Sequence, residues 1–104
     1  MNDIVVFKKR TNILTVSLGS DVSGDTFASE IREKALNDSP LVATWTVAFA
    51  TDGTDGELVL TLDDSELSAV TVKTGYMDIK RVSGGEPFAV FAPIKVLIKD
   101  TVTA

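Results

Sequence analysis

The chain of 104 residues contains no cysteine and no histidine. Without cysteine it can form neither a disulfide framework nor a thiolate metal site, and the redox compartment stays undetermined. Without histidine it lacks the commonest general base and the commonest transition-metal ligand. It also has no nucleophile elbow, dinucleotide-binding glycine motif or Walker-type loop. The sequence therefore predicts no enzyme, and no catalytic, cofactor-binding or metal-ligating residue.

Positive charge is scarce, and long apolar runs are missing. Lysine and arginine number 10 against 15 aspartates and glutamates, a net charge of −5, so neither nucleic acid nor an anionic membrane is an expected partner. No apolar run approaches the ~20 residues of a membrane span. The start, Met1–Ile4, lacks the basic and apolar regions of a secretory signal. We expect a soluble protein made in the cytosol, with one domain over residues 1–104.

β-branched residues are abundant instead: valine, threonine and isoleucine account for 31 residues, which favours strands. The clearest alternation of apolar residues comprises Leu41, Ala43, Trp45, Val47 and Phe49, followed after a turn by Leu58, Leu60 and Leu62. Because strand side chains point to opposite faces with period two, this pattern predicts an antiparallel hairpin with one face in a core. Trp45 is expected to anchor that core rather than form an exposed platform for a sugar.

Similar alternation, bounded by turn residues, predicts further strands over residues 4–7, 11–18, 75–82 and 87–99. Pro93 interrupts the last of these and marks an edge position or a bulge, because proline has no N–H to donate. Residues 63–70 are typical of one helical turn or a loop, in which Asp63 is the cap and Leu67 closes the end of the core. Seven short strands in this arrangement favour an antiparallel sandwich.

The segment Asp25–Leu36 fits two structures. Phe27, Ile31 and Ala35 lie four residues apart on one face of a helix that Asp25 or Thr26 would cap. Alternatively, a strand over the same residues directs Phe27, Ser29 and Ile31 inward. Local propensity slightly favours the helix but does not decide between the two structures.

The order of the segments resembles the small immunoglobulin-like domain of tailed-phage structural proteins, as found at the N-terminus of phage baseplate upper proteins. The resemblance covers nearly the whole chain. After an N-terminal pair of strands, it rests on Ser23-Gly24-Asp25-Thr26-Phe27, Glu30-Ile31-Arg32, Pro40-Leu41-Val42-Ala43-Thr44-Trp45-Thr46-Val47, Gly56-Glu57-Leu58-Val59-Leu60 and Gly75-Tyr76-Met77-Asp78-Ile79. The resemblance implies a strand over Thr26–Lys34. It also implies an all-β, immunoglobulin-like antiparallel β-sandwich of about seven strands with at most one short helical turn.

The function that the resemblance implies is structural. We expect a phage or prophage virion protein, a tail or baseplate component assembled in the host cytoplasm. It would act through contacts with other phage structural proteins or with copies of itself. The alternative is an immunoglobulin-like binding module that contacts a receptor or a carbohydrate. Because the predicted loops are rich in Asp, Gly, Ser and Thr and contain no aromatic residue, assembly is the preferred hypothesis.

Three charged clusters and one apolar strand are candidate sites. The loop Asp52–Glu57 could hold calcium, but its spacing is not that of a calcium loop, so a solvated turn is expected. Asp63, Asp64 and Glu66 could form a carboxylate pair, although capping is expected. The basic cluster 8–10 is expected to be the solvated end of an edge strand rather than a phosphate site. The residues predicted to form an assembly edge are Val90, Phe91, Ala92, Ile94, Val96 and Ile98.

Overall fold

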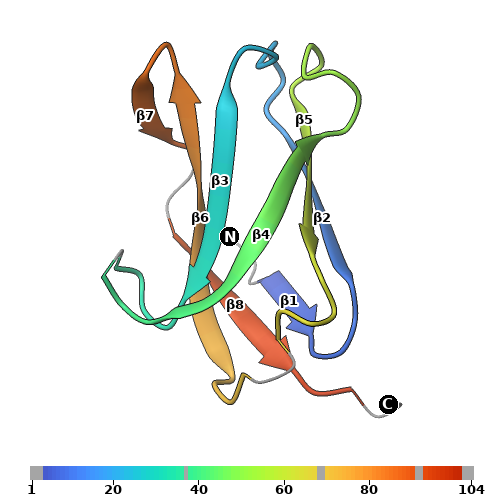
Figure 1. Cartoon of the computed structure of the whole chain (residues 1–104), viewed down its shortest axis with the longest axis vertical. Coiled ribbons are helices and arrows are strands. Elements are labelled where there is room, and N and C mark those ends of the chain that lie inside the picture. The colour runs from blue at the N-terminus through green and yellow to red at the C-terminus, as the bar shows by residue number, and fades with distance from the viewer. Residues whose placement is uncertain (1–3, 37, 68–69, 91–92, 102–104) are drawn as a thin grey trace.

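Strands provide all the regular secondary structure in the described part of the chain (Figure 1). The structure, a computed structural model, describes residues 4–36, 38–67, 70–90 and 93–101. Alternating apolar and β-branched residues, separated by turn residues, produce the strands. They are β1 (Ile4–Phe7), β2 (Asn12–Ser17), β3 (Thr26–Arg32), β4 (Leu41–Phe49), β5 (Glu57–Leu62), β6 (Thr74–Ser83), β7 (Glu86–Ala89) and β8 (Ile94–Lys99).

The strands form one hydrogen-bonded path that folds into two facing sheets. The strand order is β1-β8-β6-β3-β4-β5-β2, with β7 paired to one part of β6. One sheet contains β8, β6 and β3 and the other contains β4, β5 and β2, as strands G-F-C and D-E-B do in an immunoglobulin-like sandwich. All pairs are antiparallel except β1 with β8. The predicted immunoglobulin-like sandwich is confirmed, with eight strands rather than seven.

β4 belongs to both sheets. Its first part pairs with β3, whereas Thr46–Phe49 pairs with β5. The register shifts between Ile31 and Arg32 of β3 and leaves Val42 as the extra residue of a β-bulge. Leu41 lies beyond the bulge and is 50% exposed, so its predicted inward position is wrong. Figure 1 shows β3 and β4 diverging away from this end, which allows β4 to change sheets.

One core lies between the sheets, and both contribute large apolar side chains to it. The buried apolar residues are Val6, Val22, Ile31, Ala43, Trp45, Leu58, Leu60, Leu62, Leu67, Met77, Ile79, Val96 and Ile98. Where β3 and β4 diverge, Phe27 and Phe49 make an edge-to-face contact with ring centroids 6.2 Å apart. The core therefore continues to the end at which β4 has left β3.

The segment that fitted both a helix and a strand is β3. It pairs with β6 along its whole length and with β4 over Ser29–Arg32. Ser29 and Ile31 are buried and Phe27 is half-buried, as the strand alternation predicts. The strand predicted for Thr26–Lys34 is confirmed, although it ends at Arg32. Hydrogen-bonding partners on both sides outweigh a weak helix propensity.

The single strand predicted over residues 87–99 is wrong, because the structure has two strands there. β7 pairs with Lys80–Ser83 of β6, whereas β8 pairs with Thr74–Met77 of the same strand. The two strands thus lie one after the other along β6. Pro93 immediately precedes β8, where the missing N–H costs no ladder hydrogen bond.

Candidate interaction surface

Strand β8, which contains Ile94, Val96 and Ile98 of the predicted assembly edge, is not an edge strand. β8 lies between β1 and β6 and is hydrogen-bonded to both. Val96 and Ile98 are buried, Val90 and Ile94 are half-buried, and Phe91 and Ala92 lie outside the described residues. The edge prediction is wrong for β8, because the parallel pairing with β1 joins distant parts of the chain and leaves no local pattern.

The acidic loop Asp52–Glu57 folds as a turn whose carboxylates bind nearby donors. Asp52 accepts hydrogen bonds from the hydroxyl and the backbone N–H of Thr54, at 2.6 and 3.0 Å. Asp55 accepts one from the backbone N–H of Glu57 at 3.0 Å. Because the donors of Thr54 favour the ionised carboxylate, they lower the pKa of Asp52. Within the described ranges no group of acidic residues is arranged to hold a metal ion.

A second acidic turn follows β5 and is a loop rather than a helix. The carboxylate of Asp63 accepts hydrogen bonds from the backbone N–H and the hydroxyl of Ser65, at 3.1 and 3.3 Å. A hydrogen bond with the Asp64 carboxyl, followed by the Ser65 N–H, lowers the pKa of Asp63. The same contact with Asp63 raises the pKa of Asp64. Asp63 therefore caps the turn, as predicted.

Glu66 performs a role that the sequence did not predict. Its carboxylate accepts a hydrogen bond from the backbone N–H of Thr44 at 2.9 Å. Glu66 thus provides a partner for a backbone group in the part of β4 that does not pair with β5. The neighbouring Leu67 is buried in the core, as predicted. This acidic loop therefore closes one end of the sandwich and also supplies a hydrogen-bond acceptor to an exposed backbone N–H of β4.

β1 is an edge strand that an asparagine side chain covers. The backbone N–H of Phe7 donates to Oδ1 of Asn12, and Nδ2 of Asn12 donates to the carbonyl of Phe7, each at 3.0 Å. These bonds replace the pair that a neighbouring strand would supply. The basic cluster follows β1, as expected for the end of an edge strand, and Nζ of Lys8 lies 3.4 Å from the carboxylate of Asp100.

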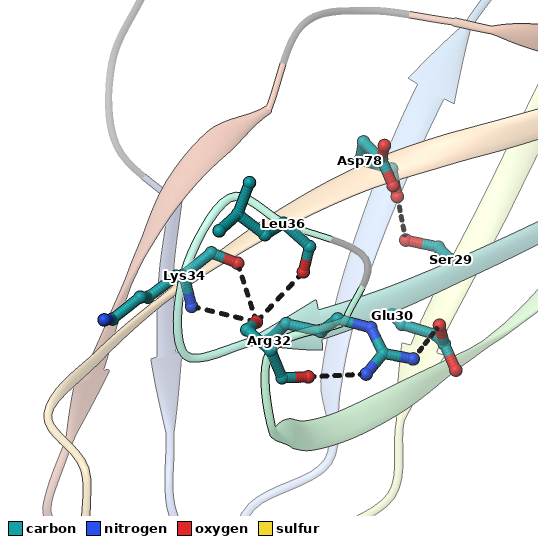
Figure 2. A network of polar contacts seen from close by, with 7 residues as sticks. Ser29, Glu30, Arg32, Lys34, Leu36 and Asp78 are labelled. Atoms are coloured by element: carbon teal, nitrogen blue, oxygen red, sulfur yellow. Dashed lines mark hydrogen bonds and ion pairs between the residues drawn. The ribbon is translucent and has the colours of Figure 1, made fainter.

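The outer face of β3, β6 and β8 is charged. Outward-pointing Glu30 and Asp78 lie opposite one another, two carboxylates on neighbouring strands. Figure 2 shows the guanidinium of Arg32 beside Glu30, at 3.0 Å, where it offsets their repulsion. Lys80 and Lys95 extend the charged surface along β6 and β8.

The loop between β3 and β4 is tied to this charged face. Arg32 donates to the carbonyl of Ser39 at 2.7 Å. The buried hydroxyl of Ser39 accepts a hydrogen bond from the backbone N–H of Lys34 at 3.3 Å and lies within hydrogen-bonding distance of the carbonyls of Lys34 and Leu36. Backbone groups in this irregular loop are thus satisfied by one serine and one arginine. Arg32 has a structural explanation and needs no ligand.

The outer face of β2, β5 and β4 is uncharged except at one end. It is formed by small or β-branched residues, which are Ile13, Thr15, Ser17, Thr46, Ala48, Val59 and Thr61. Glu57 borders this face at the end near the hairpin turn. Ile13 is 67% exposed. We call these seven residues the uncharged face; their lack of charge contrasts with a chain whose net charge is −5.

Trp45 lies in the core, as predicted, with 3% of its surface exposed. Its indole N–H is buried and has no hydrogen-bond partner among the described residues. Since the ring is part of the buried core cluster and not exposed to solvent, it offers no stacking platform for a sugar.

Comparison with known proteins provides no relative: no family model matches the chain, and no curated protein matches it significantly. No helix in the described residues is long and apolar enough to cross a membrane.

The roles of Asn12 and Glu66 in covering strand edges were not predicted from the sequence, and neither was the uncharged face. The two polar contacts join residues that no spacing rule connects, since Glu66 and Thr44 are 22 positions apart. The uncharged face had a detectable signal: the outward positions of three predicted strands all lack charge. Only the strand order shows that these positions are neighbours.

Proposed function

We propose that the chain is a structural subunit of a phage or prophage virion, a tail or baseplate component that acts through protein–protein contacts rather than by catalysis. It would be assembled in the host cytoplasm and reside in the virion beside other phage structural proteins. Two kinds of support exist: the resemblance of the segment order to a phage immunoglobulin-like domain, and the immunoglobulin-like strand order of the fold.

The uncharged face is the observation that carries this proposal. Charged side chains normally keep an exposed sheet surface solvated, and the opposite face of this sandwich has them. Uncharged side chains cost less desolvation than charged ones when another protein covers them, provided that the threonine and serine hydroxyls find hydrogen-bond partners. A face of this composition fits a protein partner. It offers no charged group for a nucleic acid and no exposed tryptophan for a carbohydrate, so the alternative as a carbohydrate-binding module is less well supported.

Purified virions provide the test. The phage or prophage that carries the gene is induced, and the particles are banded by density and probed for the chain by mass spectrometry. We expect the chain in the intact particles, and deletion of the gene should yield particles with defective tails or baseplates. Its absence from the particles, together with normal infectivity of the deletion strain, would refute the proposal.

Matched lysine variants test the role of the uncharged face. Thr46 and Ala28 are both exposed and lie at outward positions of internal strands, but in opposite sheets. Thr46→Lys places a charge on the uncharged face and should reduce incorporation into particles by about tenfold or more, because burying an unpaired charge is costly. Ala28→Lys adds the same charge to the charged face and should leave incorporation unchanged. Equal incorporation of both variants would show that the uncharged face is not the contact surface.

A further inference from the structure

The exposed edges of the two sheets differ in how they are covered. Asn12 hydrogen-bonds to both backbone groups of Phe7 in β1. Glu66 binds the N–H of Thr44 in β4. β7 has only four residues, and one of them is Pro87, which has no N–H. β2 has none of these features: it ends the strand path opposite β1, contains no proline, glycine or charge, and within the described part of the chain pairs only with β5.

The register shows which backbone groups of β2 are unpaired. In an antiparallel pair, residues that bond to the partner alternate with residues whose N–H and C=O point away from it. The N–H of Leu18 donates to the carbonyl of Gly56 at 2.8 Å, which continues the β2–β5 register. The even-numbered residues of β2 therefore face β5. The N–H and C=O groups of Ile13, Thr15 and Ser17 point outward and have no partner among the described residues.

Charge also distinguishes this edge. Residues 11–20 contain no charged side chain, although the whole chain carries a net charge of −5. Two copies of an acidic protein repel one another over most orientations, and an uncharged edge is where they can approach most closely. Antiparallel pairing would also bring the basic cluster that precedes β2 near Asp21 of the other copy, which follows β2. The exposed carboxylate of Asp21 accepts a hydrogen bond from the Ser23 N–H at 2.9 Å.

From these observations we infer that β2 pairs antiparallel with β2 of a second copy of this chain, around a two-fold axis at Thr15. This inference rests on the proposed structural function and names one of its partners. The two Thr15 residues then face one another, and Ile13 faces Ser17 of the other copy. On the inner side, the half-buried Leu14 packs against Val16 across the axis.

This pairing gives a closed assembly. Among the described strands each copy has one such edge, and the two-fold contact uses the edge of both copies, so association stops at a dimer and does not continue into a fibre. The two sheets become one continuous sheet, and the two uncharged faces become one larger surface. The inferred dimer thus doubles the area of the uncharged face, which is the surface proposed to contact other virion proteins.

The unmodified protein provides the first test. Sedimentation equilibrium up to about 1 mM protein should show a reversible monomer–dimer equilibrium with no larger species. A purely monomeric protein at that concentration would overturn the inference. An open series of larger species would also overturn it, because a two-fold contact cannot generate one.

Engineered cysteines provide the second test, since the chain has no cysteine of its own. Facing residues that share hydrogen bonds in an antiparallel pair have Cα atoms about 5.5 Å apart, which is within the range of a disulfide. With oxidised glutathione as the oxidant, Thr15→Cys should cross-link to a covalent dimer at least about tenfold faster than Ala28→Cys, an exposed site in the other sheet. Equal rates would overturn the inference. Circular dichroism should show that both variants are folded.

Mixing two variants tests the register. Ile13→Cys and Ser17→Cys should each cross-link poorly alone and efficiently when mixed. Ile13 faces Ser17 of the other copy, whereas Ile13 of the other copy lies about 13 Å further along the strand. Efficient cross-linking of Ile13→Cys alone would exclude this register. These results are independent of the virion experiment. A monomer found in virions refutes only the dimer, and a dimer absent from virions refutes only the proposed function.

Discussion

The sheet of β3, β6 and β8 and the sheet of β2, β5 and β4 share one core, yet their outer faces differ. Inward, both present large aliphatic residues, such as Ile79 in the first and Leu60 in the second, and neither residue is exposed. Outward, the first sheet carries Glu30, Arg32 and Asp78, whereas the second carries the uncharged face. Burial of apolar side chains stabilises both sheets in the same way. The two sheets therefore differ in their solvent-facing surfaces and not in how they form the core.

The ends of the two sheets are also held differently. At the first sheet, charged side chains hold the ends: Nε of Arg81 lies 2.6 Å from the carboxylate of Asp25, and Arg32 donates a hydrogen bond to the loop between β3 and β4. The turns of both sheets contain glycines at positive φ, Gly53 and Gly56 in the second and Gly84 and Gly85 in the first, but only those of the second are packed against other backbone. The first sheet should therefore respond to salt, and the second to changes in the turn residues.

Core truncations should have the largest effect and should not distinguish the sheets. Leu60→Ala and Ile79→Ala should each lower the free energy of unfolding by about 2–5 kcal/mol, because both leave a cavity in the shared core. Leu41→Ala, at a half-exposed position, should cost less than about 1 kcal/mol. Urea denaturation measures all three. If Leu60→Ala cost no more than Leu41→Ala, the second sheet would not be an equal partner in the core.

The second-largest loss of stability should come from substitutions in the turns, and it should be greater in the second sheet than in the first. Gly56 has φ of 75°, and a Cβ there would meet the backbone of Ser20. Gly56→Ala should therefore lower the free energy of unfolding by about 2–3 kcal/mol. Gly84 has φ of 60° but open space around it, so Gly84→Ala should cost only about 1 kcal/mol. Thermal or urea unfolding compares the two, and equal costs would show that the contact with Ser20 is unimportant.

The ion pair of the first sheet should have a smaller effect. A double-mutant cycle of Arg81→Met and Asp25→Asn should give a coupling free energy of about 1 kcal/mol, because the arginine remains partly exposed. The coupling should weaken in 1 M salt as the charges are screened. Coupling that does not change with salt would indicate packing rather than electrostatics and would remove this difference between the sheets.

Acid sensitivity of the hairpin turn should be the smallest effect. The pKa of Asp52 is lower in the folded protein than the value of about 3.9 in an unfolded chain. Its contribution to stability is therefore complete above the unfolded pKa and is lost as the pH falls through the folded pKa. Asp52→Asn keeps an acceptor for Thr54 but cannot titrate, so stability should fall less steeply below about pH 4. An unchanged slope in urea titrations at several pH values would contradict this role.

Much of the fold could be predicted because alternation is a local signal. The inward positions of β5 and β6 were predicted correctly, including Leu58, Leu62, Met77 and Ile79. The strand at residues 26–32 could not be predicted from propensity, because its neighbours β4 and β6 decide its conformation. The division of residues 87–99 into two strands was missed because both continue the same alternation and differ only in the part of β6 that they contact.

The sequence by itself determined that this is an all-β chain, which residues form most of its strands and which side chains fill its core. Each of these depends on periods of two residues and on the chemistry of side chains a few positions apart. Only the tertiary structure decided which strands are edges. Parallel pairing with β1 places β8 inside a sheet, Asn12 and Glu66 cover two exposed edges, and β2 is left uncovered. Edges are set by which distant segments meet, and a local pattern of residues carries no information about such contacts.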